Sequence, residues 1–201
     1  MAEQPRTAVD GPLAGHRALV VVDLQRVVGP GAPWEVPEVE GILPKVAALL
    51  AAFGPRSVLT RHRLAAAGRG RWRSFAERWV ELDADPGHWE LLDAVAAAVP
   101  VGAAVVDKTT YAAYPLPALA ARLGDAATGE LVVAGCETDC CVAATLYAAV
   151  DDGVAVTLVT DALVGSGPQG HGGVLAAAAR LPEQVRLATV EEAVTTPFDL
   201  R

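Results

Sequence analysis

The chain has few of the residues that build disulfide-rich, nucleic-acid-binding or membrane-spanning proteins. Only three of its 201 residues are cysteine, and two of these are adjacent, which does not make a disulfide framework. Sixteen basic residues stand against 24 acidic ones, so no basic face is expected to meet nucleic acid. No apolar run approaches membrane-spanning length, and residues 1–16 lack a signal-peptide pattern. We therefore expect a cytoplasmic protein without nucleic-acid or membrane partners.

The residues that are present favour one globular domain. Hydrophobic residues make up 52% of the chain, and its length is sufficient for a sizeable core. We expect a flexible N-terminal arm over residues 1–16 and a single domain over residues 17–201. Residues 62–88 hold few aliphatic side chains, and we interpret them as a cover segment with a short helix near residues 74–80.

Apolar runs alternate with segments of helical spacing. We expect strands at residues 18–22, 57–60, 103–106, 131–134, 154–159 and 185–188. We expect helices at residues 39–53, 89–99, 116–123, 140–150 and 174–181, and a glycine-rich loop at residues 165–173. This alternation is typical of an α/β fold, with a mostly parallel, Rossmann-like sheet of about six strands covered on both faces.

The stretch from Leu131 to Val150 indicates a strand, a tight turn and a helix. Gly135 ends the apolar run, and Thr138 and Asp139 are good N-cap residues. This places Cys140 and Cys141 in the first helical turn, where a thiol can have a lowered pKa and the free N–H groups can stabilise an oxyanion. A cysteine there is either a nucleophile or a small core residue, and this stretch alone does not distinguish the two.

Polar residues follow the expected strands at their carboxyl ends. Ligands bind beyond this edge of a parallel sheet, which brings a set of candidates together. The set is Asp23, Arg61, His62, Lys108, Cys140, Cys141 and Asp161. An acid, an amine and a thiol at one edge are suited to covalent hydrolysis of an amide or ester, whereas each residue alone is more often structural.

Three segments resemble the isochorismatase-like cysteine hydrolases, which include nicotinamidases and N-carbamoylsarcosine amidases. They are ALVVVDLQ, VVDKTTYAAY and VVAGCETDCCVAATLYAAVDDGVAVTLVTDAL, in the family's order. The resemblance implies a three-layer α/β/α sandwich with Asp23, Lys108 and Cys141 as the catalytic triad. It also implies a cis peptide between Cys136 and Glu137, which aims the N–H groups of Glu137 and Cys141 at the oxyanion.

The resemblance implies a cysteine-dependent hydrolase that cleaves a C–N bond of a small amide, ureido or lactam substrate through a thioester. One alternative is a vinyl-ether hydrolase of the isochorismate type led by Asp23, and another is a non-catalytic ligand-binding or assembly subunit. We expect no cofactor and no metal, because the one Asp and two His of nicotinamidases are missing after the second strand, where only His62 is a candidate ligand. Family members often form dimers or tetramers, so a homo-oligomer is expected.

Further residues are candidates for binding the small-molecule substrate, with packing or solvation as the alternative for each. They are Gln25, Trp34, Arg61, His62, Trp72, Trp79 and Tyr111.

Helix geometry separates the two adjacent cysteines. Val142, Leu146, Ala149 and Val150 form an apolar stripe that should face the sheet. Cys141 lies at the edge of this stripe and Cys140 nearly opposite it. We therefore expect Cys141 beside the strand ends, with a thiol pKa below its ordinary value, and Cys140 to be a bystander.

Overall fold

The computed structural model describes residues 16–124 and 129–199. Six parallel strands form one sheet within these residues, in the order β3-β2-β1-β4-β5-β6. The strands are β1 (His16–Val22), β2 (Ser57–His62), β3 (Ala104–Lys108), β4 (Gly129–Gly135), β5 (Ala155–Leu163) and β6 (Val185–Ala188). This confirms the predicted sheet, although β1 begins at His16, a residue assigned to the arm, and residues 1–15 of the arm lie outside the described part.

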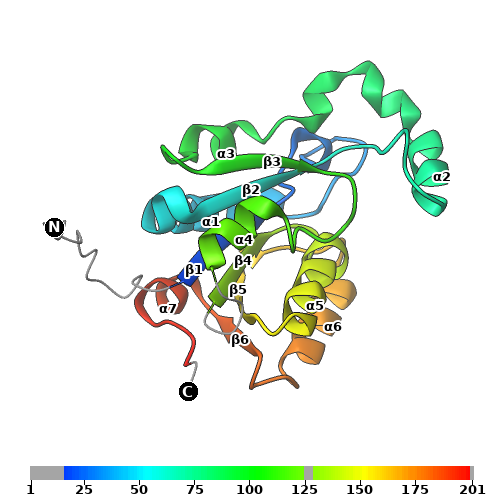
Figure 1. Cartoon of the computed structure of the whole chain (residues 1–201). Helices are drawn as coiled ribbons and strands as arrows, with labels where there is room; N and C mark the ends of the chain where they lie inside the picture. Colours follow the sequence, from blue (N-terminus) through cyan, green and yellow to red (C-terminus); the bar gives the residue numbers. More distant parts are fainter. Residues whose placement is uncertain (1–15, 125–128, 200–201) are drawn as a thin grey trace, which may run out of the picture.

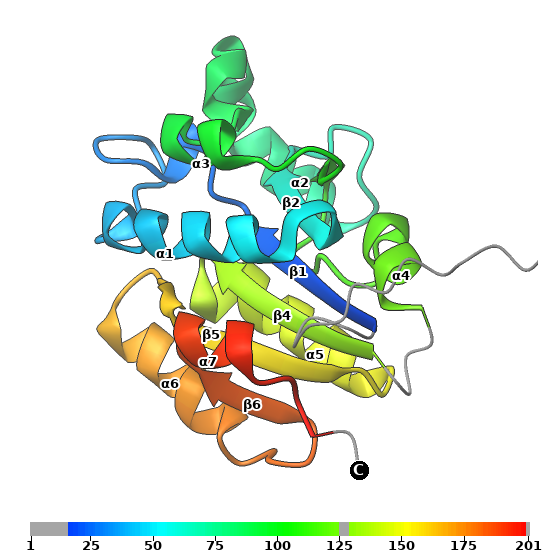
Figure 2. The same ribbon diagram turned by 90° about the vertical axis from the view of Figure 1, so that its left-hand side faces the viewer.

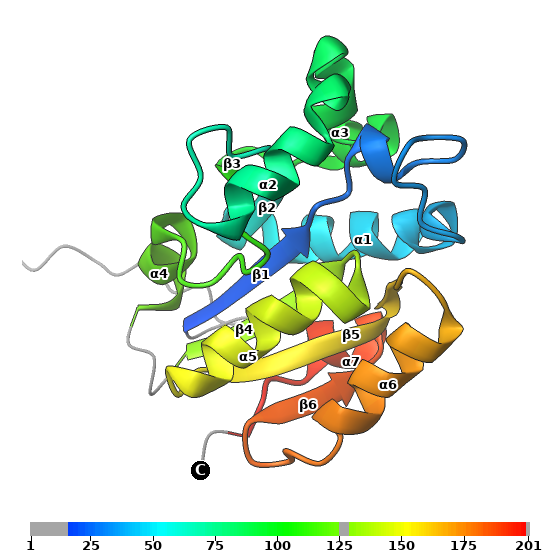
Figure 3. The ribbon, with the colours of Figure 1, turned by 90° about the vertical axis from the view of Figure 1, so that its right-hand side faces the viewer.

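Helices cover both faces of the sheet. Their bounds are α1 (Val39–Phe53), α2 (Arg71–Arg78), α3 (Asp93–Ala98), α4 (Pro117–Leu123), α5 (Ala143–Asp151), α6 (Pro168–Ala178) and α7 (Val190–Thr195). Helices α1 and α7 lie over one face and α4, α5 and α6 over the other (Figures 2 and 3). This is the expected α/β/α arrangement. No helix of the described residues is both long enough and apolar enough to span a membrane.

Alternate residues of β1 supply the two cores. Leu19 and Val21 pack with α1, whereas Val20 and Val22 pack with α5, and all four are buried. A strand buried on both faces must be apolar at every position, which explains the continuous run in the sequence. The carboxyl end of this central strand is where the polar residues begin.

The chain between β2 and β3 makes a long excursion that projects beyond the β3 side of the sheet (Figure 1). It contains α2, the 3-10 helices η3 (Val80–Ala84) and η4 (Pro86–Trp89), and α3. The helix expected near residues 74–80 begins at Arg71 instead. The helix expected over residues 89–99 is only α3, because Trp89 and Leu91 are buried in the core and Leu91 pairs with Gln25 in an isolated bridge.

Two further helices differ from the prediction. Helix α6 begins at Pro168, within the segment predicted to be a glycine-rich loop. A Cβ added at Gly170 would lie 2.1 Å from Asp139 Oδ2, so glycine is needed there for close packing rather than for a loop. Helix α7 was not predicted, although Thr189 and Glu192 form a capping box that the sequence displays.

Candidate active site

Asp23 follows β1 directly and is held in a fixed orientation. Its φ of 50° lies in the left-handed region, which is uncommon for a residue other than glycine. The Thr60 hydroxyl, at the end of β2, donates a hydrogen bond of 2.7 Å to Asp23 Oδ1. Thr60 is fully buried, so this bond fixes one carboxylate oxygen and leaves the other for different partners.

Lys108, the last residue of β3, joins the acid to the thiol. Its Nζ lies 2.6 Å from Asp23 Oδ2, 3.0 Å from the Thr110 carbonyl oxygen and 3.5 Å from Cys141 Sγ. Burial disfavours the ammonium form, but the neighbouring Asp23 and Cys141 outweigh burial and raise the pKa of Lys108. The amine is therefore charged at neutral pH and faces both groups of the expected triad.

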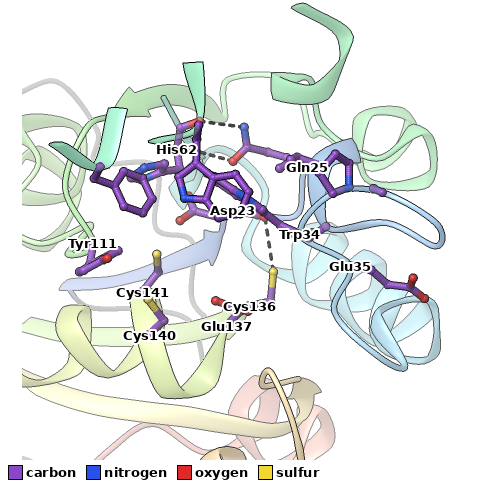
Figure 4. A pocket seen from close by; sticks show the side chains of 16 residues that line it. Asp23, Gln25, Trp34, Glu35, His62, Tyr111, Cys136, Glu137, Cys140 and Cys141 are labelled. Carbon is purple, nitrogen blue, oxygen red and sulfur yellow. Dashed lines mark hydrogen bonds between the residues drawn. The ribbon is translucent and has the colours of Figure 1, made fainter. Parts of the chain in front are cut away.

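A tight turn brings the third residue of this triad to the strand ends. Gly135 has a φ of 107°, and a Cβ there would lie 2.3 Å from the Val22 carbonyl oxygen, so only glycine allows this approach to β1. The peptide bond between Cys136 and Glu137 is cis, as the resemblance implies. The Cys136 thiol donates to the Asp23 carbonyl oxygen at 3.4 Å (Figure 4).

The helix after this turn begins earlier than predicted. Residues Thr138–Val142 form a π-helical turn, η6, that leads into α5, and the Val142 N–H donates to the Glu137 carbonyl oxygen at 3.1 Å. Thr138 and Asp139 are not N-caps. The Thr138 hydroxyl bonds to His171 Nδ1 at 2.9 Å, and the Asp139 carboxylate accepts from the Ser166 N–H at 2.9 Å. These bonds tie the turn to α6 itself and to the chain just before it.

The two adjacent cysteines differ in partners and in pKa. Cys141 is buried and meets Lys108, whereas Cys140 is half-buried. A hydrogen bond to Cys140, burial and the Asp23 carboxylate raise the pKa of Cys141, while Lys108 acts in the opposite direction. The same hydrogen bond lowers the pKa of Cys140. The expected lowering at Cys141 is thus wrong, because the thiol lies beside a carboxylate in a buried site. Its proton remains in place until a base removes it.

A cavity of about 480 Å³ opens over these residues. Figure 4 shows the thiols of Cys140 and Cys141 at one side and Asp23, His62 and Trp34 across from them. The residues that line the cavity are Asp23, Gln25, Val27, Val28, Ala32, Pro33, Trp34, Glu35, His62, Phe75, Trp79, Tyr111, Cys136, Glu137, Cys140 and Cys141. Cys140 thus reaches the cavity, although helix geometry placed it nearly opposite the apolar stripe, and its role as a bystander stays a prediction.

His62 is a neutral group in this cavity. Burial, helped by the charge of Lys108, lowers the pKa of His62 to about 4. The side-chain amide of Gln25 accepts a hydrogen bond from the backbone N–H of His62 at 2.7 Å. It also donates to the backbone carbonyl oxygens of His62 and Trp89, at 3.1 and 2.8 Å. Gln25 therefore holds the end of β2 against η4, even though part of it lines the cavity.

Several candidates lie elsewhere. Arg61 does not line the cavity, because it pairs with Asp107 and Glu90 at 2.7 Å each. Trp72 stands behind the lining, with its ring centroid 4.7 Å from that of Tyr111. Asp161 accepts from the Val190 N–H at 2.8 Å and does not line this cavity.

Sequence reasoning missed Thr60 and six lining residues of the cavity, which are Val27, Val28, Ala32, Pro33, Glu35 and Phe75. Thr60 carries a signal, since it stands at a strand end beside the selected Arg61. The sequence gives no such signal for Phe75 and Glu35. The position of Phe75 depends on how the excursion between β2 and β3 folds over the sheet, and that of Glu35 on the loop before α1.

The ligand set of a nicotinamidase metal does not fit this chain. The group of metal-ligand type found among the described residues is Asp23, His62 and Cys141, whose ligand atoms lie within 4.8 Å of one another. The Asp23 carboxylate is already paired with the Lys108 ammonium, which would repel a cation. His62 alone remains at the place where a nicotinamidase has more ligands.

The Isochorismatase domain profile matches residues 17–192. The chain belongs to the isochorismatase family. A cysteine hydrolase from Pseudomonas syringae pv. phaseolicola 1448A has the same fold, with 21% identity, a TM-score of 0.74 and coverage of 96% of this chain and 97% of that one.

Two more solved structures share the fold. An isochorismatase family protein from Desulfovibrio vulgaris subsp. vulgaris str. Hildenborough is 22% identical, with a TM-score of 0.73 and coverage of 89% and 96%. The pyrazinamidase of Pyrococcus horikoshii, solved in complex with zinc, is 24% identical, with a TM-score of 0.66 and coverage of 87% and 99%. No curated protein sequence matches the chain significantly.

Proposed function

We propose that the protein is a cysteine amidohydrolase that cleaves the C–N bond of a small amide, ureido or lactam substrate, with Asp23, Lys108 and Cys141 as the catalytic residues. The observation that carries the proposal is the contact of one buried ammonium with both other groups, at 2.6 Å from Asp23 and 3.5 Å from Cys141. All three residues are at least nine-tenths buried, yet Asp23 and Cys141 line the cavity. A structural ion pair does not require a thiol at that point.

The proposed reaction begins with proton transfer from the Cys141 thiol to Asp23. The raised pKa of Cys141 means that this transfer accompanies attack on the substrate carbonyl instead of preceding it. A C–S bond forms, and the oxyanion meets the N–H groups of Glu137 and Cys141 at the start of the helix. Asp23 then protonates the leaving nitrogen as the C–N bond breaks.

The second half of the reaction hydrolyses the thioester. Ammonia or an amine leaves, and water takes its place. Asp23 removes a proton from this water as it attacks, and the thiolate of Cys141 leaves and regains the proton. Lys108 stays charged throughout and stabilises the negative charge that moves between Asp23 and the sulfur.

An ammonia-release screen over primary amides, ureido acids and lactams tests the proposal. Asp23→Asn and Lys108→Ala should each lower kcat/KM by a factor of ~10² or more, in line with the loss of a general base or of its charged partner. Asp107→Asn is the matched control, because Asp107 lies outside the cavity and pairs with Arg61 and Arg63. Turnover near the wild-type value in Asp23→Asn would refute the assignment of Asp23, Lys108 and Cys141 as the catalytic triad.

Two results in the same screen would support other functions. Equal activity of Cys141→Ser and wild type would point to thiol-independent chemistry of the vinyl-ether type. A protein that binds small amides but never turns them over would be a binding or assembly subunit.

A further inference from the structure

The turn that carries the proposed oxyanion N–H groups is held from α6 by two adjacent side chains. Thr138 follows Glu137 directly, and its hydroxyl bonds to His171 Nδ1 at 2.9 Å. The Asp139 carboxylate accepts hydrogen bonds from the N–H and the hydroxyl of Ser166. His171 lies in the first turn of α6 and Ser166 just before it, so this helix supports the turn in addition to the strand ends.

The two side-chain contacts differ in burial. Thr138 is fully buried, whereas Ser166 is exposed. Within residues 16–124 and 129–199, His171 is the one hydrogen-bond partner found for the Thr138 hydroxyl. A buried hydroxyl that loses its partner is destabilising, whereas water replaces a lost partner at an exposed site. The contact with His171 is therefore the one that fixes a side chain of the turn in a single orientation.

Two glycines allow α6 to approach the turn closely. A Cβ at Gly165 would lie 3.0 Å from the His171 Cβ and 2.8 Å from Asp139 Oδ1. A Cβ at Gly170 would lie 2.1 Å from Asp139 Oδ2. There is no room for a side chain at either position, so the first turn of α6 and its imidazole have a defined place against the turn.

The backbone around Thr138 connects this contact to the two proposed oxyanion donors. The Thr138 N–H donates to the carbonyl oxygen of Val164, just after β5, at 2.9 Å. The Glu137 carbonyl oxygen, in the same peptide group, accepts from the N–H groups of Cys140 and Val142 at 3.1 Å each. A displacement of Thr138 therefore moves the peptide group that orders the chain on both sides of Cys141.

We propose that His171 is a positioning residue, which acts through Thr138 and not on the substrate. It does not line the cavity over Cys141. Its imidazole holds the Thr138 side chain, and this keeps the N–H groups of Glu137 and Cys141 aimed at the oxyanion. The part of this inference that concerns the reaction rests on the proposed amidohydrolase function.

Amide hydrogen exchange measures the positioning without any substrate. In His171→Ala, a peptide that covers residues 136–143 should exchange about tenfold faster, because one hydrogen bond no longer opposes local opening. His171→Asn should restore most of the protection, since asparagine carries a hydrogen-bonding atom as many bonds from the backbone as Nδ1. Gln169→Ala, at an exposed position of the same helical turn, is the matched control and should change nothing.

Steady-state kinetics with the best amide of the ammonia-release screen measures the effect on the reaction. Loss of a whole oxyanion donor costs about 10²–10³ in kcat, so donors that are loosened but still present should cost about tenfold. In His171→Ala, kcat and kcat/KM should fall together with KM unchanged, because the oxyanion does not exist in the bound substrate. His171→Asn should recover most of this loss, and Gln169→Ala should match the wild type. Rates are expressed per folded protein, determined by thermal unfolding, so a loss of stability alone does not produce this pattern.

Variants of Thr138 test the route of the effect. Thr138→Val should reproduce the loss in kcat, and Thr138→Ser, which keeps the hydroxyl, should retain most activity. This pair carries the same comparison if His171→Ala does not fold. Combined with His171→Ala, Thr138→Val should add almost nothing, because both changes remove one contact. Losses that multiply in the double variant would show that His171 acts independently of Thr138 and would overturn the inference.

Unchanged exchange over residues 136–143 in His171→Ala would also overturn it. So would a raised KM with kcat unchanged, or a loss that His171→Asn does not recover. The outcome is separable from the proposed function. Protection that depends on His171, in a wild type that releases no ammonia, would defeat the amidohydrolase proposal and leave the support of the turn standing. Ammonia release by His171→Ala at the wild-type rate would defeat only the inference.

Discussion

The buried, neutral His62 predicts a measurable dependence of stability on pH. Its side chain is 5% exposed, and its pKa is lowered from 6.5 to about 4 in the folded protein, chiefly by burial. Between these two values the unfolded chain binds a proton that the folded protein does not bind. Stability is therefore fully present above pH 6.5 and is lost as the pH falls towards 4.

The magnitude follows from the shift. A change of one pKa unit corresponds to about 1.4 kcal/mol, so the shift from 6.5 to about 4 represents about 3 kcal/mol when it is fully expressed. Between pH 7 and pH 5 the expected loss from this one group is about 2 kcal/mol. This window lies above the ordinary pKa values of aspartate and glutamate, which limits their contribution.

Denaturant unfolding at pH 7 and pH 5 measures the effect in three proteins. The wild type should lose about 2 kcal/mol more than His62→Gln does between these pH values. The comparison uses pH dependence, so a constant loss of packing in the variant does not matter. His16→Gln, at an exposed site, is the control and should behave as the wild type does. If His62→Gln and wild type had the same pH dependence, the imidazole would not be held neutral in the folded protein.

Three further predictions concern the site itself. Thr60→Val should lower kcat about tenfold or more because Asp23 loses a hydrogen bond to its charged form, whereas Thr60→Ser should retain most activity, and steady-state kinetics at a saturating amide concentration compares them. Cys140→Ala should keep most activity and move the pH midpoint of iodoacetamide inactivation downward, because the hydrogen bond that raises the pKa of Cys141 is removed; an upward shift would contradict this reasoning. Hydrolysis should survive exhaustive chelation, measured as ammonia release, and activity restored only by a divalent ion would identify His62 as a ligand.

The sheet and the site differ in how far the sequence predicts them. Each strand buried on both faces, such as β1 from Ala18 to Val22, is a continuous apolar run and is found at the predicted place. Polar residues after such runs stand at the ligand-binding edge, so spacing gathered Asp23 and Lys108 there with five other candidates, and the family resemblance then paired them. Their contact also depends on the strand order β3-β2-β1, which the apolar pattern does not give.

Local signals failed where tertiary partners compete for the same residues. Thr138 and Asp139 have the chemistry of N-caps, yet their side chains bond to His171 and Ser166, which are about 30 residues away in the sequence. Gly170 favours a loop by propensity but lies in a helix because only a glycine fits against Asp139. The pKa of Cys141 was mispredicted for a similar reason, since the hydrogen bond to Cys140, burial and the Asp23 carboxylate all raise it at this helix start.

The origin of the two parts of the cavity suggests how its specificity can change. The proposed triad comes from the ends of β1 and β3 and from the turn after β4, all fixed by the register of the sheet. The aromatic wall is different, since Trp34 comes from the loop before α1, and Phe75 and Trp79 from the excursion between β2 and β3. Substitutions in that wall leave the bonds between Asp23 and Lys108 untouched, because no backbone of the sheet has to move. Selectivity for the acyl group can therefore be altered without changing the geometry of attack, and Trp34→Phe is the smallest such change.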